Sequence, residues 1–112
     1  MPQLETGDIA WAELGPSRGR EQSGRSPVLV VSSPGYLESI DTLVIVVPVT
    51  TRDRGWPNHI PLSGPTGLGH ASWAMTEQPV TIARERVFDV AGNVDAVCLA
   101  SVRVYLIDFL GL

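Results

Sequence analysis

Apolar runs alternate with polar, glycine- and proline-containing segments, a pattern that predicts a chain built mainly of short strands. Residues 28–33 and 43–49 are continuous, β-branched-rich runs, typical of strands buried on both faces. We therefore expect them at the centre of the sheet. Residues 8–14 read as a first strand. Pro48 cannot donate to a strand ladder, so it marks an edge or the end of the third strand.

The second half of the chain carries weaker strand signals. Short strands are expected at 58–62, 72–78 and 87–94, with a turn at 63–67. Trp73 lies in one of these apolar patterns and is expected in the core.

The chain should end in a helix of roughly four turns, because Asp95 suits an N-cap and no glycine or proline follows before Gly111. Apolar residues lie on several sides of this helix. One face carries Leu99, Val102, Leu106 and Phe109, and a narrow polar stripe carries Ser101, Tyr105 and Asp108. Three further apolar residues, Val97, Val104 and Ile107, belong to neither. A domain this small cannot cover so much apolar surface, which predicts a homodimer.

Length and composition indicate one globular domain over residues 1–112, mainly β with a C-terminal α-helix. Hydrophobic residues make up 44% and charged residues 18%, unlike a disordered chain. The one cysteine, Cys98, has no intramolecular disulfide partner, and its apolar neighbours suggest a buried thiol. No apolar run is long enough to span a membrane. We expect a cytoplasmic protein.

The formal net charge is −4, which argues against broad electrostatic adhesion to nucleic acid. All eight basic side chains are arginines, however, and they cluster. The clusters are Arg18, Arg20 and Arg25, then Arg52 and Arg54, then Arg84 and Arg86. The guanidinium fork suits phosphate, so these clusters are candidate nucleic-acid contacts.

Two polar loops, at 15–26 and 51–57, are the functional candidates. Trp56 in the second loop either stacks a base or packs over the end of the barrel. His59 and His70 offer an acid–base pair for phosphodiester cleavage, but their spacing fits no metal-ligand motif. A hydrogen-bonded structural histidine is the alternative reading of each.

Five segments in order, GDIAWAEL, GREQSGRSPVLVVS, VVPVTTRDRGWP, MTEQ and LIDFLGL, resemble the successive landmarks of the MazF/PemK toxins. The resemblance covers nearly the whole chain. It implies an SH3-like barrel of the MazF/CcdB type and a homodimer. It also implies a cognate antitoxin and single-stranded RNA as partners, with cleavage through the ribose 2′-hydroxyl and no metal or other cofactor.

Carried over position by position, the family's catalytic threonine is Thr50. Its catalytic arginine precedes the proline, where this chain has Ser26; Arg25 is adjacent but should point to the other side of an extended segment. The two acidic-Gln pairs correspond to Glu21 with Gln22 and to Glu77 with Gln78. A basic residue that commonly follows the second pair is replaced by Val80.

The chemistry assigns roles to these residues. An arginine stays protonated and would stabilise the charge on the pentacoordinate phosphorus. Thr50 would donate a hydrogen bond to a phosphoryl oxygen, and Glu21 would act as the base. Loss of the arginine predicts impaired cleavage, since removing such a donor typically costs about 10²–10³ in rate.

Two other functional classes stay open. One is a catalytically inactive MazF-like protein that binds antitoxin or RNA, which Ser26 and Val80 favour. The other is a gyrase poison like CcdB, against which the acidic-Gln loop and the Pro-x-Thr strand end argue.

Overall fold

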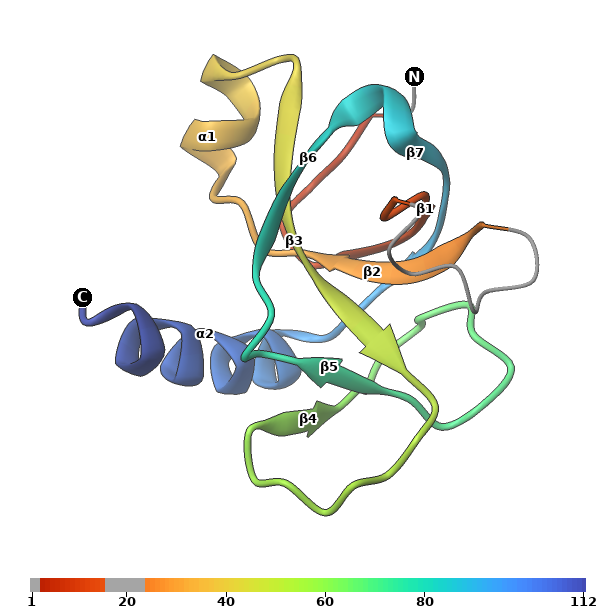
Figure 1. The fold of residues 1–112 in the computed structure, drawn as a ribbon, viewed down its shortest axis with the longest axis vertical. Helices are drawn as coiled ribbons and strands as arrows, with labels where there is room; N and C mark the ends of the chain where they lie inside the picture. Colours follow the sequence, from red (N-terminus) through yellow and green to blue (C-terminus); the bar gives the residue numbers. More distant parts are fainter. Residues whose placement is uncertain (1–2, 16–23) are drawn as a thin grey trace.

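A computed structural model describes residues 3–15 and 24–112. Its strands are β1 (Asp8–Ala12), β2 (Ser26–Val30), β3 (Leu43–Thr50), β4 (His59–Pro61), β5 (Trp73–Met75), β6 (Val80–Ala83) and β7 (Val87–Asn93). Its helices are α1 (Pro34–Ser39), the 3₁₀ helix η2 (Arg84–Arg86) and α2 (Ala96–Leu110). The element order confirms the predicted mainly β chain with a C-terminal helix (Figure 1).

All strand pairs are antiparallel, in the order β4-β5-β3-β2-β1-β7, with β6 also paired to β3. The predicted central strands, β2 and β3, are central. The pairing of β3 with β6 ends at Val46 and its pairing with β5 starts at Val49. Pro48 lies at the break between these two ladders, which explains how a strand inside the sheet accommodates it.

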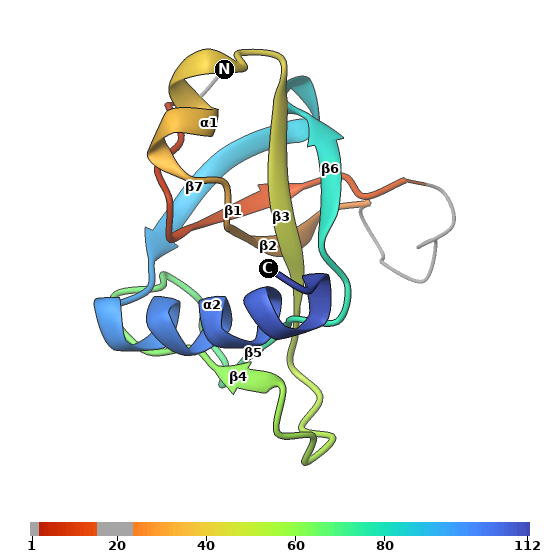
Figure 2. The same ribbon diagram turned by 90° about the vertical axis from the view of Figure 1, so that its left-hand side faces the viewer.

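The sheet buries a core on each of its faces, because side chains alternate along every strand. One core combines Ala10, Val28 and Val46 with Leu4 and Ile82. The other contains Ile9, Leu29, Val47, Ala74 and, from α2, Cys98 and Val102. Figure 2 shows α2 lying across this second face of the sheet.

The sequence prediction missed three elements, α1, β6 and the 3₁₀ helix η2, and misjudged several boundaries. Ser33-Pro34-Gly35 begins a short helix, α1, in which the Ser33 side chain accepts from the Tyr36 N–H and proline occupies the first turn. Residues 80–83 form β6, which pairs with residues 43–46 in the first half of β3. The expected strands at 58–62 and 72–78 shorten to three residues each.

Helix α2 begins and ends as predicted. The Asp95 side chain accepts from the Cys98 N–H, and Gly111 ends the helix with a positive φ of 71°. Hydrogen bonds from the Cys98 N–H and the Ser63 side chain hold the pKa of Asp95 below its ordinary value. Cys98 is buried as expected, and this burial raises the pKa of its thiol.

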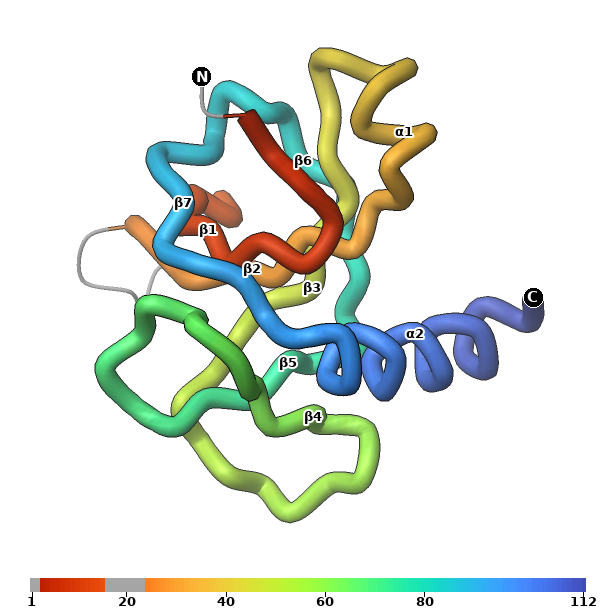
Figure 3. Tube along the Cα trace, turned by 180° about the vertical axis from the view of Figure 1, so that it is seen from behind, coloured from red at the N-terminus to blue at the C-terminus, as the bar shows by residue number. Residues whose placement is uncertain are grey.

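The segment between β4 and β5 packs against β7 and the start of α2, as seen from behind in Figure 3. Its backbone is bonded there: the Asn93 N–H donates to Pro65 and the Asp95 N–H to Ser63. A Cβ atom on Gly67 or Gly92 would collide with the facing backbone, so this close approach requires glycine at both positions. Among the described residues, no helix combines the length and the apolar character needed to cross a membrane.

Candidate RNA-cleaving site

Thr50 and Ser26 occupy corresponding positions on neighbouring strands. The last paired couple of β2 and β3 is Val28 with Pro48, and both strands continue for two residues beyond it. Beyond that pair the two strands have different partners: Ser26 pairs with Ala12 of β1, and Thr50 pairs with Trp73 of β5. Thr50 is half-buried and Ser26 is buried. The two positions that the sequence comparison singled out therefore each lie two residues beyond the end of the β2–β3 ladder.

The Thr50 hydroxyl is held by the loop that follows β3. Its oxygen accepts a hydrogen bond of 3.1 Å from the Arg52 N–H. Because a hydroxyl also carries one proton to donate, Thr50 keeps a donor for a ligand. In the register of β3 and β5, Thr50 also lies directly opposite Trp73. Trp73 is half-buried rather than in the core, since Ala74, its neighbour on β5, supplies the core-facing side chain.

Arg25 takes a different direction. Its guanidinium carbon lies 4.2 Å from the centre of the Phe88 ring on β7. In the sheet, β1 separates β2 from β7, whereas Thr50 lies on β3, on the other side of β2. In this arrangement the Arg25 guanidinium lies on the β7 side of β2, and Thr50 lies on the β3 side.

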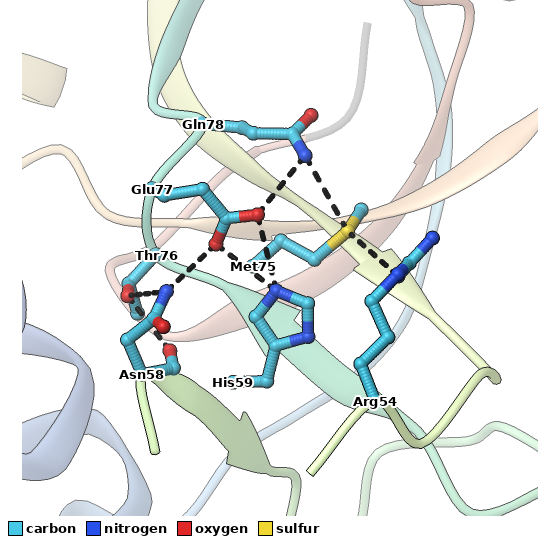
Figure 4. A network of polar contacts seen from close by, with 7 residues as sticks. All are labelled: Arg54, Asn58, His59, Met75, Thr76, Glu77 and Gln78. Carbon is cyan, nitrogen blue, oxygen red and sulfur yellow. Dashed lines mark hydrogen bonds and ion pairs between the residues drawn. The ribbon is translucent and has the colours of Figure 1, made fainter. Parts of the chain in front are cut away.

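A second group of predicted residues gathers between the β3–β4 loop and the turn after β5 (Figure 4). We call Asn58, His59, Glu77 and Gln78 the Glu77 network. The His59 Nε2 atom lies 3.0 and 3.1 Å from the two carboxylate oxygens of Glu77. The Asn58 amide donates to Oε1 at 2.8 Å and the Gln78 amide to Oε2 at 3.1 Å. Glu77 thus joins β4 to the turn that precedes β6.

The net effect of these contacts on Glu77 favours its charged form. Burial by itself raises the pKa of Glu77, but hydrogen bonds from His59, its own backbone and Gln78 outweigh burial and lower the pKa. His59, whose side chain is 2% exposed, is the hydrogen-bonded structural histidine of the sequence analysis. Its Nδ1 atom is buried with no partner.

Trp56 and Arg54 lie beside this network. The Trp56 and His59 ring centres are 4.7 Å apart at an interplanar angle of 52°, and Trp56 is 49% exposed. The Arg54 guanidinium carbon lies 5.7 Å from the Trp56 ring centre, and its Nη1 contacts the Met75 sulfur at 3.9 Å. The Gln78 amide contacts the same sulfur at 3.7 Å. An exposed aromatic ring beside a guanidinium suits an unpaired base and its phosphate.

Other sequence predictions fall elsewhere. Arg18, Arg20, Glu21 and Gln22 lie outside the described residues. His70 is exposed in the β4–β5 segment and takes no part in the network. Arg84 donates to the carbonyls of Leu37, Ile40 and Leu43, which ties it to the end of α1.

Sequence reasoning missed Asn58, Met75 and the pairing of His59 with Glu77. His59 and Glu77 are 18 residues apart, and only the pairing of β4 with β5 brings them together. An open cavity of about 420 Å³ lies away from this site, between residues 3–6, α1 and Arg84. In the part of the chain that the structure describes, no group of three or more His, Cys, Asp or Glu side chains could hold a metal ion.

Fold and site define a small antiparallel sheet protein with one long covering helix and an arginine- and tryptophan-bearing loop beside its strand ends. Residues 5–110 match the profile of the PemK-like, MazF-like toxins of type II toxin-antitoxin systems. The chain belongs to this family.

Individual relatives agree with the assignment. The chain is 35% identical over 60 residues to the endoribonuclease toxin MazF of Escherichia coli; this match covers 54% of the chain and spans only 53% of that protein's length. It is 34% identical to endoribonuclease MazF9 of Mycobacterium tuberculosis over 87% of both chains. MazF of Deinococcus radiodurans has the same fold, at 30% identity, full coverage of both chains and a TM-score of 0.80. MazF in the MazE–MazF complex from that organism matches at 28% identity, 100% and 99% coverage and the same TM-score of 0.80. These matches confirm the predicted barrel type.

Proposed function

We propose that this protein is the toxin of a type II toxin-antitoxin pair, an endoribonuclease that cuts single-stranded RNA without a metal. Residues 1–112 act as one toxin domain. The observation that carries the proposal is the position of Thr50, which ends β3 with a hydroxyl proton to donate, beside the loop that bears Arg52, Arg54 and Trp56. The family membership and the endoribonuclease names of the relatives support it.

In the proposed reaction the ribose 2′-hydroxyl loses its proton and its oxygen attacks the adjacent phosphorus. The bond from phosphorus to the 5′-oxygen breaks, and that oxygen takes up a proton. The products are a 2′,3′-cyclic phosphate and a 5′-hydroxyl. Thr50 donates to a phosphoryl oxygen as negative charge builds there. Glu21 is the proposed base, and Arg18, Arg20, Gln22, Arg52, Arg54, Trp56, Glu77 and Gln78 form the proposed RNA surface.

Catalysis in this chain should be slow. The family's arginine position is Ser26, whose short neutral side chain cannot stabilise the phosphoryl charge. Arg25, the nearest substitute, has its guanidinium over Phe88. The same two observations favour the second candidate, a protein that binds antitoxin or RNA without cutting.

The proposed partners are a second copy of the chain and an antitoxin, and the proposed compartment is the cytoplasm. The exposed apolar residues of α2, among them Val97 and Val104, support a homodimer. The Deinococcus MazE–MazF complex supports an antitoxin partner.

Incubation of the purified protein with a long single-stranded RNA tests the activity. We expect slow cleavage that is unchanged by magnesium or EDTA and leaves cyclic phosphate ends. Thr50→Ala should abolish it, whereas Thr81→Ala, at an exposed position on β6, should not. Absence of cleavage together with tight binding to RNA or antitoxin would replace the enzyme by the binding protein.

A further inference from the structure

We propose that Glu77 is a positioning residue of the RNA surface, which fixes Trp56 and Gln78 in place without touching the RNA itself. This inference rests on the proposed function, because it concerns how that surface binds RNA. It assigns Glu77 a role different from the direct contact that the sequence pattern suggests.

The hydrogen-bonding capacity of the carboxylate is the first reason. A carboxylate offers about four acceptor positions on its two oxygens. In this protein Oε1 accepts from Asn58 and His59, and Oε2 accepts from Gln78 and His59. Both oxygens are therefore occupied by donors from the protein. An RNA group that sought the carboxylate would first have to displace one of them.

The second reason is the geometry of the groups that Glu77 holds. Glu77 fixes the His59 ring, which is buried, and that ring packs 4.7 Å from the Trp56 ring. The backbone N–H of His59 also donates to the backbone carbonyl of Trp56 at 3.1 Å. Trp56 is thereby held by its backbone and its ring, while the residue stays 49% exposed. Glu77 thus holds Trp56 in position indirectly, through the His59 ring.

The same carboxylate orients Gln78. The Gln78 amide nitrogen donates to Glu77 Oε2, and it also contacts the Met75 sulfur that Arg54 contacts from the other side. With its nitrogen held in this way, Gln78 presents a fixed amide group. A side chain fixed before binding loses less entropy when it binds RNA, so the network should contribute mainly to affinity.

A double-mutant design separates positioning from contact. Glu77→Gln replaces one carboxylate oxygen by an amide nitrogen, which cannot accept the hydrogen bond made there. Glu77→Asp keeps the charge but shortens the side chain. Each substitution therefore breaks part of the Glu77 network. Binding is measured with a fluorescent mixed-sequence single strand whose 2′-hydroxyls are replaced by fluorine, which prevents cleavage. We expect each variant to bind about tenfold more weakly than the unsubstituted protein. Glu85→Gln, which removes an exposed charge from η2, is the matched control and should change binding by less than about twofold.

The deciding comparison repeats both substitutions in a Trp56→Ala/Gln78→Ala background. A residue that acts only through Trp56 and Gln78 has nothing left to position there, so the further loss should fall below about twofold. Thermal unfolding of each variant checks that it is folded. If Glu77→Gln does not fold, the comparison is made with Glu77→Asp alone.

An equal loss in both backgrounds would mean that Glu77 contacts RNA directly and would overturn the inference. Tighter binding by Glu77→Gln would also overturn it, because Glu77 would then act as a repulsive charge. If the unsubstituted protein binds no single strand at all, the proposed function itself fails, and the positioning role fails with it.

Discussion

The guanidinium of Arg25 lies 4.2 Å from the ring centre of Phe88 on β7, which directs it away from Thr50 on β3. A cation over an aromatic face gains about 0.5–1 kcal/mol at an exposed site. We expect that an arginine held in this way does not take the role of the arginine that the family resemblance places at position 26, although the two positions are adjacent in the chain.

RNA binding should depend on the arginines of the β3–β4 loop despite the net charge of −4. Arg52 is exposed, and Arg54 lies over Trp56. If both contact phosphates, Arg52→Ala/Arg54→Ala should reduce the slope of log affinity against log salt by about 1.4, since a single strand contributes about 0.7 per phosphate. Titration of the uncleavable strand at several salt concentrations measures this slope.

Arg103→Ala serves as the control, because it removes an exposed arginine that lies outside this loop and outside the three arginine clusters. It should leave the salt slope unchanged. An unchanged slope in the Arg52/Arg54 variant, or an equal change in the control, would place the phosphate contacts elsewhere.

The Glu77 network should also make folding stability depend on pH. Burial raises the pKa of Glu77, but the hydrogen bonds from His59, its own backbone and Gln78 outweigh it, so the folded pKa lies below the ordinary value of the unfolded chain. A lowered carboxylate pKa stabilises the folded state above the ordinary value, and this contribution disappears as pH falls through the lowered pKa. The stability difference between the unsubstituted protein and Glu77→Gln should therefore be largest near neutral pH and shrink in acid. Urea unfolding from pH 7 to pH 3 measures it, and a difference that grows in acid would contradict the assignment.

Self-association should depend on the C-terminal turns of α2. There Leu106, Ile107, Leu110 and Leu112 line an apolar groove of about 250 Å³ together with Val31 and Ile45. Ile107→Glu/Leu110→Glu would place two charges on this surface, so we expect a monomer at micromolar concentration in sedimentation, against a dimer for the unsubstituted protein. Ala96→Glu, at the exposed start of the same helix, should leave the dimer intact. A monomeric unsubstituted protein would refute the homodimer.

The sequence was informative where one local signal determines the structure. The continuous apolar runs of β2 and β3 and the cap residues Asp95 and Gly111 each determine an element without help from distant residues. Helix α1 was missed because Pro34-Gly35 is also a turn signal, and only the Ser33 cap distinguishes the two. Strand β6 depends on its pairing with β3, which the four residues do not encode by themselves.

The candidate site divides in the same way. The family resemblance pointed to Thr50 and Ser26, each of which stands next to a local landmark, a strand end or a proline. The contact between His59 and Glu77 depends on the register of β4 against β5, in which His59 pairs with Met75. Neither residue alone carries a signal for that pairing, so the sequence analysis treated Glu77 as an RNA contact and named no partner for His59, which it read as an acid–base candidate or a hydrogen-bonded structural histidine.

The sharpest prediction concerns Ser26→Arg, which should raise the rate of RNA cleavage by about 10²–10³, the usual effect of one donor aimed at a developing negative charge. Ser26 and Thr50 each lie two residues beyond Val28 and Pro48, the last pair of β2 and β3, and the family resemblance places an arginine at position 26, so we expect that side chain to extend toward the group that Thr50 serves. Binding should change much less than rate, because affinity draws on several arginines whereas the transition-state charge depends chiefly on this one. Single-turnover cleavage with enzyme in excess isolates the chemical step from product release.

Ser39→Arg, at the exposed end of α1, is the control that adds the same charge away from the site, and it should not accelerate cleavage. Thermal unfolding of the variant must accompany the comparison. Ser26 is only 8% exposed, so an arginine at this position fits only if its guanidinium reaches solvent. If folded Ser26→Arg is no faster than the unsubstituted protein, Arg25→Ala in the original sequence separates the two remaining explanations. A loss of residual cleavage would mean that Arg25 leaves Phe88 and serves the phosphate when RNA binds. If the original sequence has no residual cleavage to lose, the chain binds without cutting for a reason beyond position 26.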